Sequence, residues 1–366
     1  MNRSSVRPAQ PPGGTAYVLR LIDVGAAIDL DAAIARLKSW TVVRGPSTLR
    51  GPLGAGAGGV VLSQSPVDVE VGEREVGEAT AWVRVRLFEF GIAAVRFALP
   101  VDVSDGDALV SLAASVEDDA GFDDEARSLW RQLVRDLGPA VKQPSSNDFV
   151  EDYSVFVLPE PPGPSERRDE LLARLLLGED DPRPLARQQI DEALARGIHY
   201  FADDLVLVDY DAAVVLDPTG AAELVDIFEL ASAHLLELRY YDQLLSRSVA
   251  TLVTEATRHR RQWFRSPFSD LTERALLLVL EVGELADSFS HAITLMGDTY
   301  SVQVYQLASE RLRIAEAAAA VHQKLEALTR SAEALNGHVE SRRGVALEAL
   351  VVILIMVEVA LALWRH

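Results

Sequence analysis

The chain has 366 residues, of which 49% are hydrophobic, and its formal net charge at pH 7 is -20. It contains no cysteine, so disulfides, thiolate zinc sites, iron–sulfur clusters and cysteine nucleophiles are excluded. The negative charge disfavours broad, non-specific binding to nucleic acids or anionic lipids, because the field of the protein would repel both.

Residues 1–14 are predicted to form a disordered tail. They are rich in Pro, Gly, Ser and Gln and contain no apolar run, so they do not form a signal peptide. Residues 15–217 alternate between strand and helix patterns and predict an α/β body, with halves at 15–140 and 150–217. We expect strands at 16–23, 58–63, 67–71 and 153–158, hairpins at 81–99 and 204–216, and helices at 29–37, 107–116, 124–137, 166–177 and 185–196.

The two predicted hairpins resemble each other. Residues 89–95 align with residues 209–215, and both stretches run from a polar turn into small and β-branched residues. This favours an internal duplication, for which the alternative is chance similarity between two hydrophobic hairpins.

From residue 218 to residue 343 the pattern is helical. Pro218 suits the start of a helix, and long helices are expected at 221–256, 270–313 and 315–342, packed as antiparallel hairpins. The predicted fold class is therefore α+β: an α/β body, duplicated if the hairpins share an origin, then a long-helix hairpin region and one C-terminal transmembrane helix.

The transmembrane helix is predicted at residues 344–364. This stretch is interrupted only by Glu348 and Glu358, and it is long enough to cross a hydrocarbon core of about 30 Å. The two carboxylates fall on one seam of the helix, so they can face another helix instead of lipid, which predicts a homo-oligomer. The alternative is a buried helix in the core of a soluble oligomer. The abundance of Arg and Ala indicates a bacterium, so we expect a single-pass protein of the bacterial cytoplasmic membrane with its body in the cytoplasm.

An acidic set lies around the second hairpin and comprises Asp203, Asp204, Asp209 and Asp211. Close carboxylates at a loop suit Mg²⁺ or Ca²⁺, but strand ends and turns collect Asp for conformational reasons as well. No EF-hand, H-E-x-x-H, G-x-S-x-G or P-loop pattern is present, so no catalytic residue and no cofactor is predicted.

One basic cluster contrasts with the acidic background. It comprises Arg258, Arg260, Arg261, Trp263 and Arg265, with no acid between Glu255 and Asp270. Arginine beside an aromatic ring suits phosphates, exposed bases or lipid headgroups. The alternative is a cationic helix end that complements the helix dipole.

Residues 200–213, 235–242 and 297–300 resemble the YagE family, also called required for meiotic nuclear division, which is a domain of unknown function. The positions that carry the resemblance are Asp203, Asp204, Asp209, Glu229, Glu237, Arg239, Tyr240, Asp242, Asp298 and Tyr300. The resemblance implies a membrane-anchored protein, with relatives at the mitochondrial inner membrane that support translation by tethering ribosomes, and it implies no catalytic residue. A mitochondrial inner-membrane location is thus the alternative to the bacterial one. Four charged residues of one predicted helix favour ion pairs between helices over a functional site: Glu229, Glu237, Arg239 and Asp242.

Two functional hypotheses follow. The first is a tail-anchored scaffold that recruits a partner, such as the ribosome, to the membrane surface. The second is a membrane-bound, metal-dependent enzyme or sensor that uses the acidic edge between Asp203 and Asp211.

Overall fold

The computed structural model describes residues 13–44, 65–77, 79–118, 120–145, 150–195, 197–258 and 299–330. The chain divides into two compact units. The described parts of the first unit fall within residues 13–240 and 299–317, and those of the second within residues 241–258 and 318–330. One long helix, α6 (Ala222–Arg258), runs from the first unit into the second.

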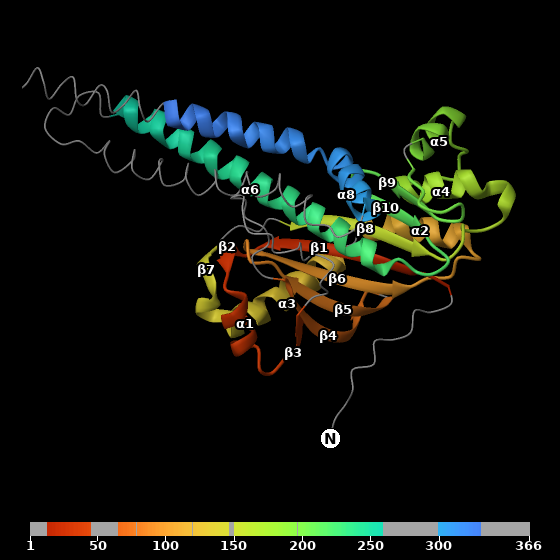
Figure 1. Ribbon diagram of the computed structural model, residues 1–366, viewed down its shortest axis with the longest axis horizontal. Helices are drawn as coiled ribbons and strands as arrows, with labels where there is room; N and C mark the ends of the chain where they lie inside the picture. Colours follow the sequence, from red (N-terminus) through yellow and green to blue (C-terminus); the bar gives the residue numbers. More distant parts are fainter. Residues whose placement is uncertain are drawn as a thin grey trace, which may run out of the picture. The chain divides into compact units, whose positions relative to one another are not determined.

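An eight-stranded sheet forms the centre of the first unit, with the strand order β3-β4-β5-β6-β1-β8-β10-β9 (Figure 1). Neighbouring strands are antiparallel except β8 and β10, which are parallel. A second sheet pairs β2 with β7. The strands are β1 (Thr15–Asp23), β2 (Gly25–Ile28), β3 (Thr41–Arg44), β4 (Val67–Val76), β5 (Ala79–Leu87), β6 (Ile92–Pro100), β7 (Val141–Pro144), β8 (Val150–Leu158), β9 (Leu205–Val208) and β10 (Ala212–Leu216).

The hairpin expected at residues 81–99 is formed by β5 and β6, and its turn depends on Gly91. Gly91 has a φ of 86°. A Cβ atom at this position would lie 1.8 Å from the carbonyl oxygen of Gly25, so a larger residue would clash with the backbone. The glycine therefore fixes the point at which β5 ends and β6 begins, and brings the turn against the start of β2.

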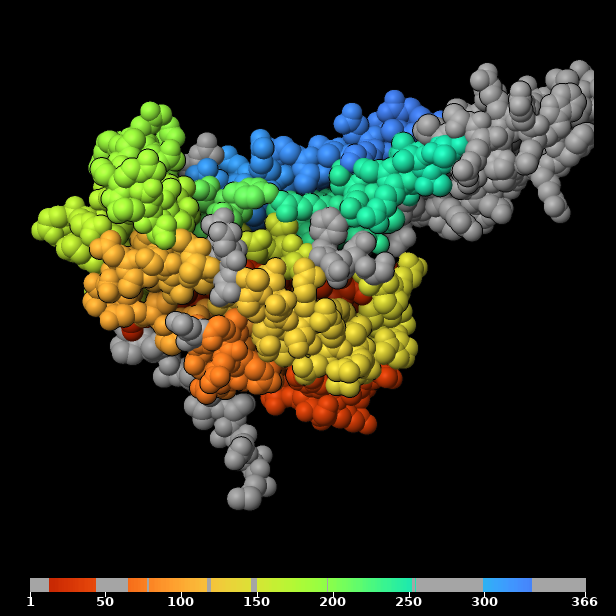
Figure 2. All heavy atoms as spheres, turned by 180° about the vertical axis from the view of Figure 1, so that it is seen from behind, coloured from red at the N-terminus to blue at the C-terminus, as the bar shows by residue number. Residues whose placement is uncertain are grey.

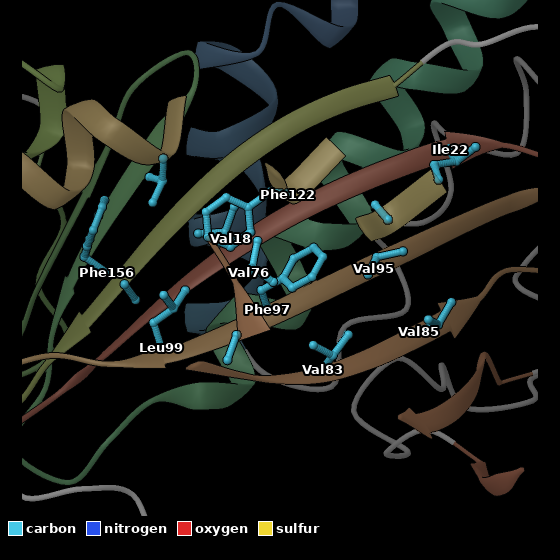
Figure 3. Close-up of a cluster of buried hydrophobic side chains, with 14 of the residues drawn as sticks. Val18, Ile22, Val76, Val83, Val85, Val95, Phe97, Leu99, Phe122 and Phe156 are labelled. Atoms are coloured by element: carbon cyan, nitrogen blue, oxygen red, sulfur yellow. The ribbon is translucent and has the colours of Figure 1, made fainter. Parts of the chain in front are cut away.

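One face of the sheet packs on helices α1 (Leu30–Arg36), α2 (Gly106–Asp118), α3 (Ala120–Leu137), α4 (Arg168–Leu177) and α5 (Arg187–Leu194). Side chains alternate along each strand, so Val83 and Val85 of β5 and Val95 and Phe97 of β6 enter this core (Figure 3). The ring of Phe122 from α3 meets Phe97 edge-on, with the ring centres 5.1 Å apart. From behind, α2 and α3, orange to yellow, cover this face (Figure 2).

The opposite face of the sheet packs on α6 and on α8 (Thr299–Arg311), which contacts β9. Phe228 of α6 is fully buried and stacks on Tyr153 of β8, with ring centres 5.8 Å apart. The same alternation that sends Val83 and Val85 to one face sends Arg84 and Arg86 to this one. The sheet therefore presents charged side chains to α6.

Within the second unit, the helical residues 318–330 contact the end of α6. The Lys324 ammonium lies 2.5 Å from a carboxylate oxygen of Asp242 and 2.7 Å from the hydroxyl of Ser246. Leu245 and Val321 are buried. Asp242, which supported the YagE resemblance, thus forms an ion pair between helices.

Several expectations fall outside the described residues: the tail up to residue 12, the strand at 58–63, most of the helix at 270–313, and the helix at 344–364 with Glu348 and Glu358. Strands from both expected halves of the body, 15–140 and 150–217, join one sheet. The duplication stays a prediction.

The membrane-anchored fold class is corrected. Among the described helices none is both long and apolar enough to span a bilayer. At 37 residues α6 has the length, but charged residues such as Asp226, Glu229 and Glu237 interrupt it at nearly every turn. The fold described here is a mixed α+β fold with one large sheet, and the transmembrane helix, the membrane as a partner and the single-pass location are withdrawn.

Candidate functional site

Two groups of charged side chains lie between α6 and the sheet. We call the first the balanced cluster, which consists of Asp68, Arg84, Arg86, Arg96, Asp226 and Glu229. We call the second the acid cluster; it consists of two pairs, Asp23 with Glu237 and Glu151 with Arg239. Both belong to the first unit.

Strand register assembles the balanced cluster. Arg86 of β5 lies opposite Asp68 of β4, and Arg84 lies opposite Arg96 of β6. The guanidinium of Arg86 donates to both carboxylate oxygens of Asp68, over 2.7 and 3.0 Å. From α6, one turn brings Asp226 and Glu229 to the same face, where Arg96 donates to Asp226 over 2.6 Å and to Glu229 over 2.7 Å.

Three positive and three negative side chains thus meet in a buried site. Burial opposes the ionisation of Asp226, but Arg96, Arg86 and Arg84 outweigh it and hold the pKa of Asp226 well below its usual value. For Arg86, burial is likewise outweighed, by Glu229 and Asp226, and its pKa is raised. Asp226 and Arg86 therefore stay ionised, and the cluster joins α6 to three strands, which is a structural role.

The acid cluster lies farther along α6. Glu237 follows Glu229 by eight residues, about two turns, so both project from one side of the helix. Asp23 ends β1 and accepts a hydrogen bond from the Ser145 hydroxyl over 2.8 Å. Glu151, opposite Leu21 near the start of β8, forms an ion pair with Arg239.

All three carboxyl groups of the acid cluster have raised pKa values. Burial raises the pKa of Glu237 well above its usual range, and the charge of Asp23 adds to this. Burial also raises the pKa of Asp23, although Ser145 opposes the shift. The pKa of Glu151 rises to about 7 because burial, helped by Asp152, outweighs Arg239.

Glu237 is the least satisfied member. Only 3% of its surface is exposed, and neither carboxylate oxygen has a hydrogen-bond partner among the described residues. One turn earlier on α6, the ring nitrogen Nδ1 of His234 lies 2.7 Å from the hydroxyl of Tyr305 on α8. Burial lowers the pKa of His234 to about 3, so this histidine is neutral at physiological pH.

The four acids predicted as metal ligands do not converge. Asp203 and Asp204 precede β9, whereas Asp209 and Asp211 follow it. The Asp204 carboxylate accepts the backbone N–H groups of Tyr200 and Phe201, over 2.8 and 2.9 Å, so it closes a loop. In the part of the chain that the structure describes, no three acidic or histidine side chains are grouped to hold a metal ion.

The same segment carries exposed aromatic side chains, which the sequence did not single out. We call Tyr200, Phe201 and Tyr210 the aromatic edge; they are 61%, 66% and 48% exposed. The rings of Tyr200 and Phe201 meet edge-on, and the Tyr300 ring of α8 lies 5.1 Å from Tyr200. The outer side of β9 is not open to another strand at Val206, because Ile198 pairs with it.

The turn that carries Tyr210 is anchored from two directions. The buried hydroxyl of Tyr153 lies 3.1 and 3.0 Å from the carbonyl oxygens of Asp209 and Ala212. Arg239 donates to the hydroxyl of Tyr210. The aromatic edge is therefore exposed but held in place.

The remaining predicted residues are dispersed. Tyr240 is half-buried on α6 at the end of the first unit, and Asp298 lies outside the described residues. Arg258 is the last residue of α6, and the rest of the basic cluster, Arg260, Arg261, Trp263 and Arg265, lies beyond the described part.

Sequence reasoning missed the arginines of the balanced cluster. The available signal was their alternation: Arg84 and Arg86 occupy every second position in the apolar run from Val83 to Leu87. A half-buried strand normally exposes such residues to water, and here α6 covers them.

Comparisons with known proteins give a family. The model of the family described as "Uncharacterized protein MJ0711, N-terminal domain" matches residues 13–223. The chain is 27% identical over 246 residues to the uncharacterized protein MJ0711 of Methanocaldococcus jannaschii, covering 65% of this chain and 74% of that protein. No solved structure matches.

These findings overturn the YagE resemblance, which rested on short motifs. The bacterial membrane location loses its support too, because the relative is archaeal and no described helix spans a membrane, and the mitochondrial alternative rested on the withdrawn resemblance. The chain belongs to the family of the MJ0711 N-terminal domain.

Proposed function

We propose that the chain is a recruitment protein whose aromatic edge binds a positively charged segment of another protein. One observation carries the proposal. Among the described residues, four large hydrophobic side chains are strongly exposed, and three of them, Tyr200, Phe201 and Tyr210, flank the single strand β9. Exposed aromatic side chains that gather in one place are typical of binding surfaces.

The chemistry of this edge favours a cationic partner. Aromatic ring faces attract Arg and Lys side chains, and Asp203 adds an exposed carboxylate beside Phe201. The nearby cations are already engaged: Arg239 with Glu151, and Arg311 within 4.0 Å of Asp209. The net charge of -20 would draw a basic segment toward the protein over a longer range.

The geometry favours recruitment over metal-dependent catalysis. The carboxylates of the acidic edge are divided between the two ends of β9, and Asp204 is used to hold the loop. The ribosome was implied only by the withdrawn resemblance. We therefore define the partner by its positive charge and use purified ribosomes as one probe.

The test compares two variants of the full chain. Tyr200→Ser with Phe201→Ser removes the most exposed rings, and Val43→Ser removes an apolar side chain, 50% exposed, from β3 at the opposite edge of the sheet. The probe is a fluorescent arginine-rich peptide, whose affinity is measured by anisotropy at two salt concentrations. We expect binding about tenfold weaker in the double variant and unchanged in Val43→Ser.

Equal affinities in all three proteins would refute the proposal, because binding would then reflect net charge alone. Co-sedimentation with purified ribosomes follows the same design. A loss confined to the double variant would identify the ribosome as a partner, whereas no sedimentation with any of the three proteins would remove it as one.

A further inference from the structure

The acid cluster lies near the last residues of α6 that belong to the first unit. The part of α6 that belongs to the first unit ends at Tyr240, three residues after Glu237, and the helix continues into the second unit. Glu237 is thus among the last residues of α6 that the first unit buries. A displacement of the turn around Glu237 would therefore loosen α6 at the end of its contact with the first unit.

The charges of the cluster do not balance. It contains three buried carboxyl groups, and Arg239 is the only positive side chain that forms an ion pair with any of them in the described part of the chain. An ionised, buried carboxylate without a cation or a hydrogen-bond donor is strongly unfavourable. An ionised Glu237 would be such a carboxylate, because its oxygens have no hydrogen-bond partner among the described residues and the charged group that acts on it, Asp23, is another acid.

The charged group that acts on Glu237 is Asp23, and the cation Arg239, two residues further along α6, is paired with Glu151. On α6 itself, His234 is neutral and hydrogen-bonded to Tyr305 of α8. From the sheet, β1 presents Asp23, β8 carries Glu151 and the exposed Asp152, and the β5–β6 turn carries Glu89. All these titratable groups of the sheet are acids.

We infer that the acid cluster is a proton-operated latch on α6. While Glu151 and Glu237 carry protons, the helix stays seated on the end of the sheet up to Tyr240. When the protons leave, the charge of Glu237 meets that of Asp23 beneath the helix, and the turns around Glu237 open toward water. The inference concerns α6 and is independent of the proposed function at the aromatic edge.

Glu151 sets the lower end of the pH range. Its pKa is raised from 4.5 to about 7, so the stability that its neutral form contributes is complete below about pH 4.5 and is lost as the pH rises through 7. The pKa of Glu237 is raised as well, so its contribution falls in the same direction and extends the loss above pH 7. The latch therefore holds in acid and opens in alkali.

The experiment measures amide hydrogen exchange along α6 in the full chain, at several pH values from 5 to 9, as protection factors corrected for the intrinsic rate. From pH 5 to pH 9 we expect protection of residues 233–241 to fall at least about tenfold, while that of residues 222–230 over the balanced cluster stays constant. Glu151→Gln with Glu237→Gln should abolish the fall, because neither amide can ionise.

The matched control is Glu229→Gln, the same change in the balanced cluster. It should lower protection at all pH values and leave the pH-dependent fall at residues 233–241 in place. The inference is overturned if the parent shows equal protection at pH 5 and pH 9, or if the double Gln variant keeps the fall of the parent. Should that variant not fold, the carboxyl carbon of Glu237 is titrated by NMR in the parent, where an ordinary pKa near 4.5 would overturn the inference equally.

Discussion

The balanced cluster and the acid cluster lie beneath the same helix, on the same face of the same sheet, about two turns apart. Both bury their carboxylates: Glu229 and Glu237 are almost fully enclosed. They differ in cations, since the first has three arginines for three acids, and the second has Arg239 for three acids. As a result, the pKa of Asp226 is lowered and that of Glu237 is raised.

Charge balance, and not depth of burial, decides whether the carboxyl groups of each part of α6 are ionised in the folded protein. Burial by itself disfavours the ionised form of any carboxyl group. Where arginines compensate, as at Asp226, the ions hold the helix in one register; where they do not, as at Glu237, the group keeps its proton. This contrast predicts the following effects of substitution and of pH.

Arg86→Met should have the largest effect. The substitution removes the cation that bonds Asp68 at both oxygens and lies 2.9 Å from Asp226 and 3.3 Å from Glu229, so three acids lose a buried partner. We expect the free energy of unfolding to fall by about 3–5 kcal/mol, measured by urea denaturation at pH 7. The control is Arg74→Met on β4, where the exposed Arg74 lies 3.8 Å from Glu125 and a change of less than about 1 kcal/mol is expected. Equal losses in the two variants would mean that the balanced cluster contributes no more than a surface pair.

The pH dependence of stability should show the two clusters acting in opposite directions. Asp226, with its lowered pKa, contributes stability that is present above its unfolded pKa of 3.8 and is lost as the pH falls further. Glu151 contributes stability that is lost between about pH 4.5 and pH 7, on the order of 3 kcal/mol for its shift. Urea denaturation from pH 3 to pH 9 should place the maximum near pH 4 to 5. A steady rise in stability from pH 5 to pH 8 would contradict the acid cluster.

Glu237→Met should stabilise the protein at pH 8, although it removes a charged residue from a helix. Met has nearly the volume of Glu and needs no hydrogen bond, so it relieves an unsatisfied buried group. We expect a gain of about 1–2 kcal/mol in the free energy of unfolding, measured by urea denaturation. Glu229→Met, the equivalent change in the balanced cluster, should destabilise instead, because it leaves Arg96 short of a partner. The same sign for both variants would remove the distinction between the clusters.

The sequence predicted the elements better than the contacts between them. The hairpin around Gly91 and the start and end of α6 were anticipated, because turn chemistry and helical periodicity are local signals. The balanced cluster was not: Arg96 meets Asp226 and Glu229 at separations of 130 and 133 residues, and no local pattern encodes such a pairing. Glu229, Glu237 and Arg239 were recognised as charged helix residues. Whether each one finds a partner of opposite charge depends on which strand it faces, which the sequence does not show.

The fold divides the acidic edge, which the sequence offered as a candidate metal site, for a related reason. Asp203 to Asp211 is compact in sequence, but an extended strand of four residues spans roughly 13 Å and places the two acidic pairs at its opposite ends. The loop that Asp204 closes instead presents Tyr200 and Phe201 to solvent. A single sequence does not reveal this exposure, because aromatic residues beside a strand usually belong to the core.

Tyr210→Phe should have the smallest effect and sharpens the boundary of the acid cluster. The Tyr210 hydroxyl accepts a hydrogen bond from Arg239, but the side chain is half exposed, and Arg239 keeps its ion pair with Glu151 in the variant. We expect the free energy of unfolding at pH 7 to change by less than about 0.5 kcal/mol, because water can replace an exposed hydroxyl. The pH at which stability declines should also stay near 7.

Arg239→Met is the informative contrast, since it removes the cation itself and should move that decline to higher pH by raising the pKa of Glu151 further. If Tyr210→Phe moved the decline as far as Arg239→Met does, the tyrosine hydroxyl would have to be counted as a member of the acid cluster, and the aromatic edge would be coupled to α6 through Arg239.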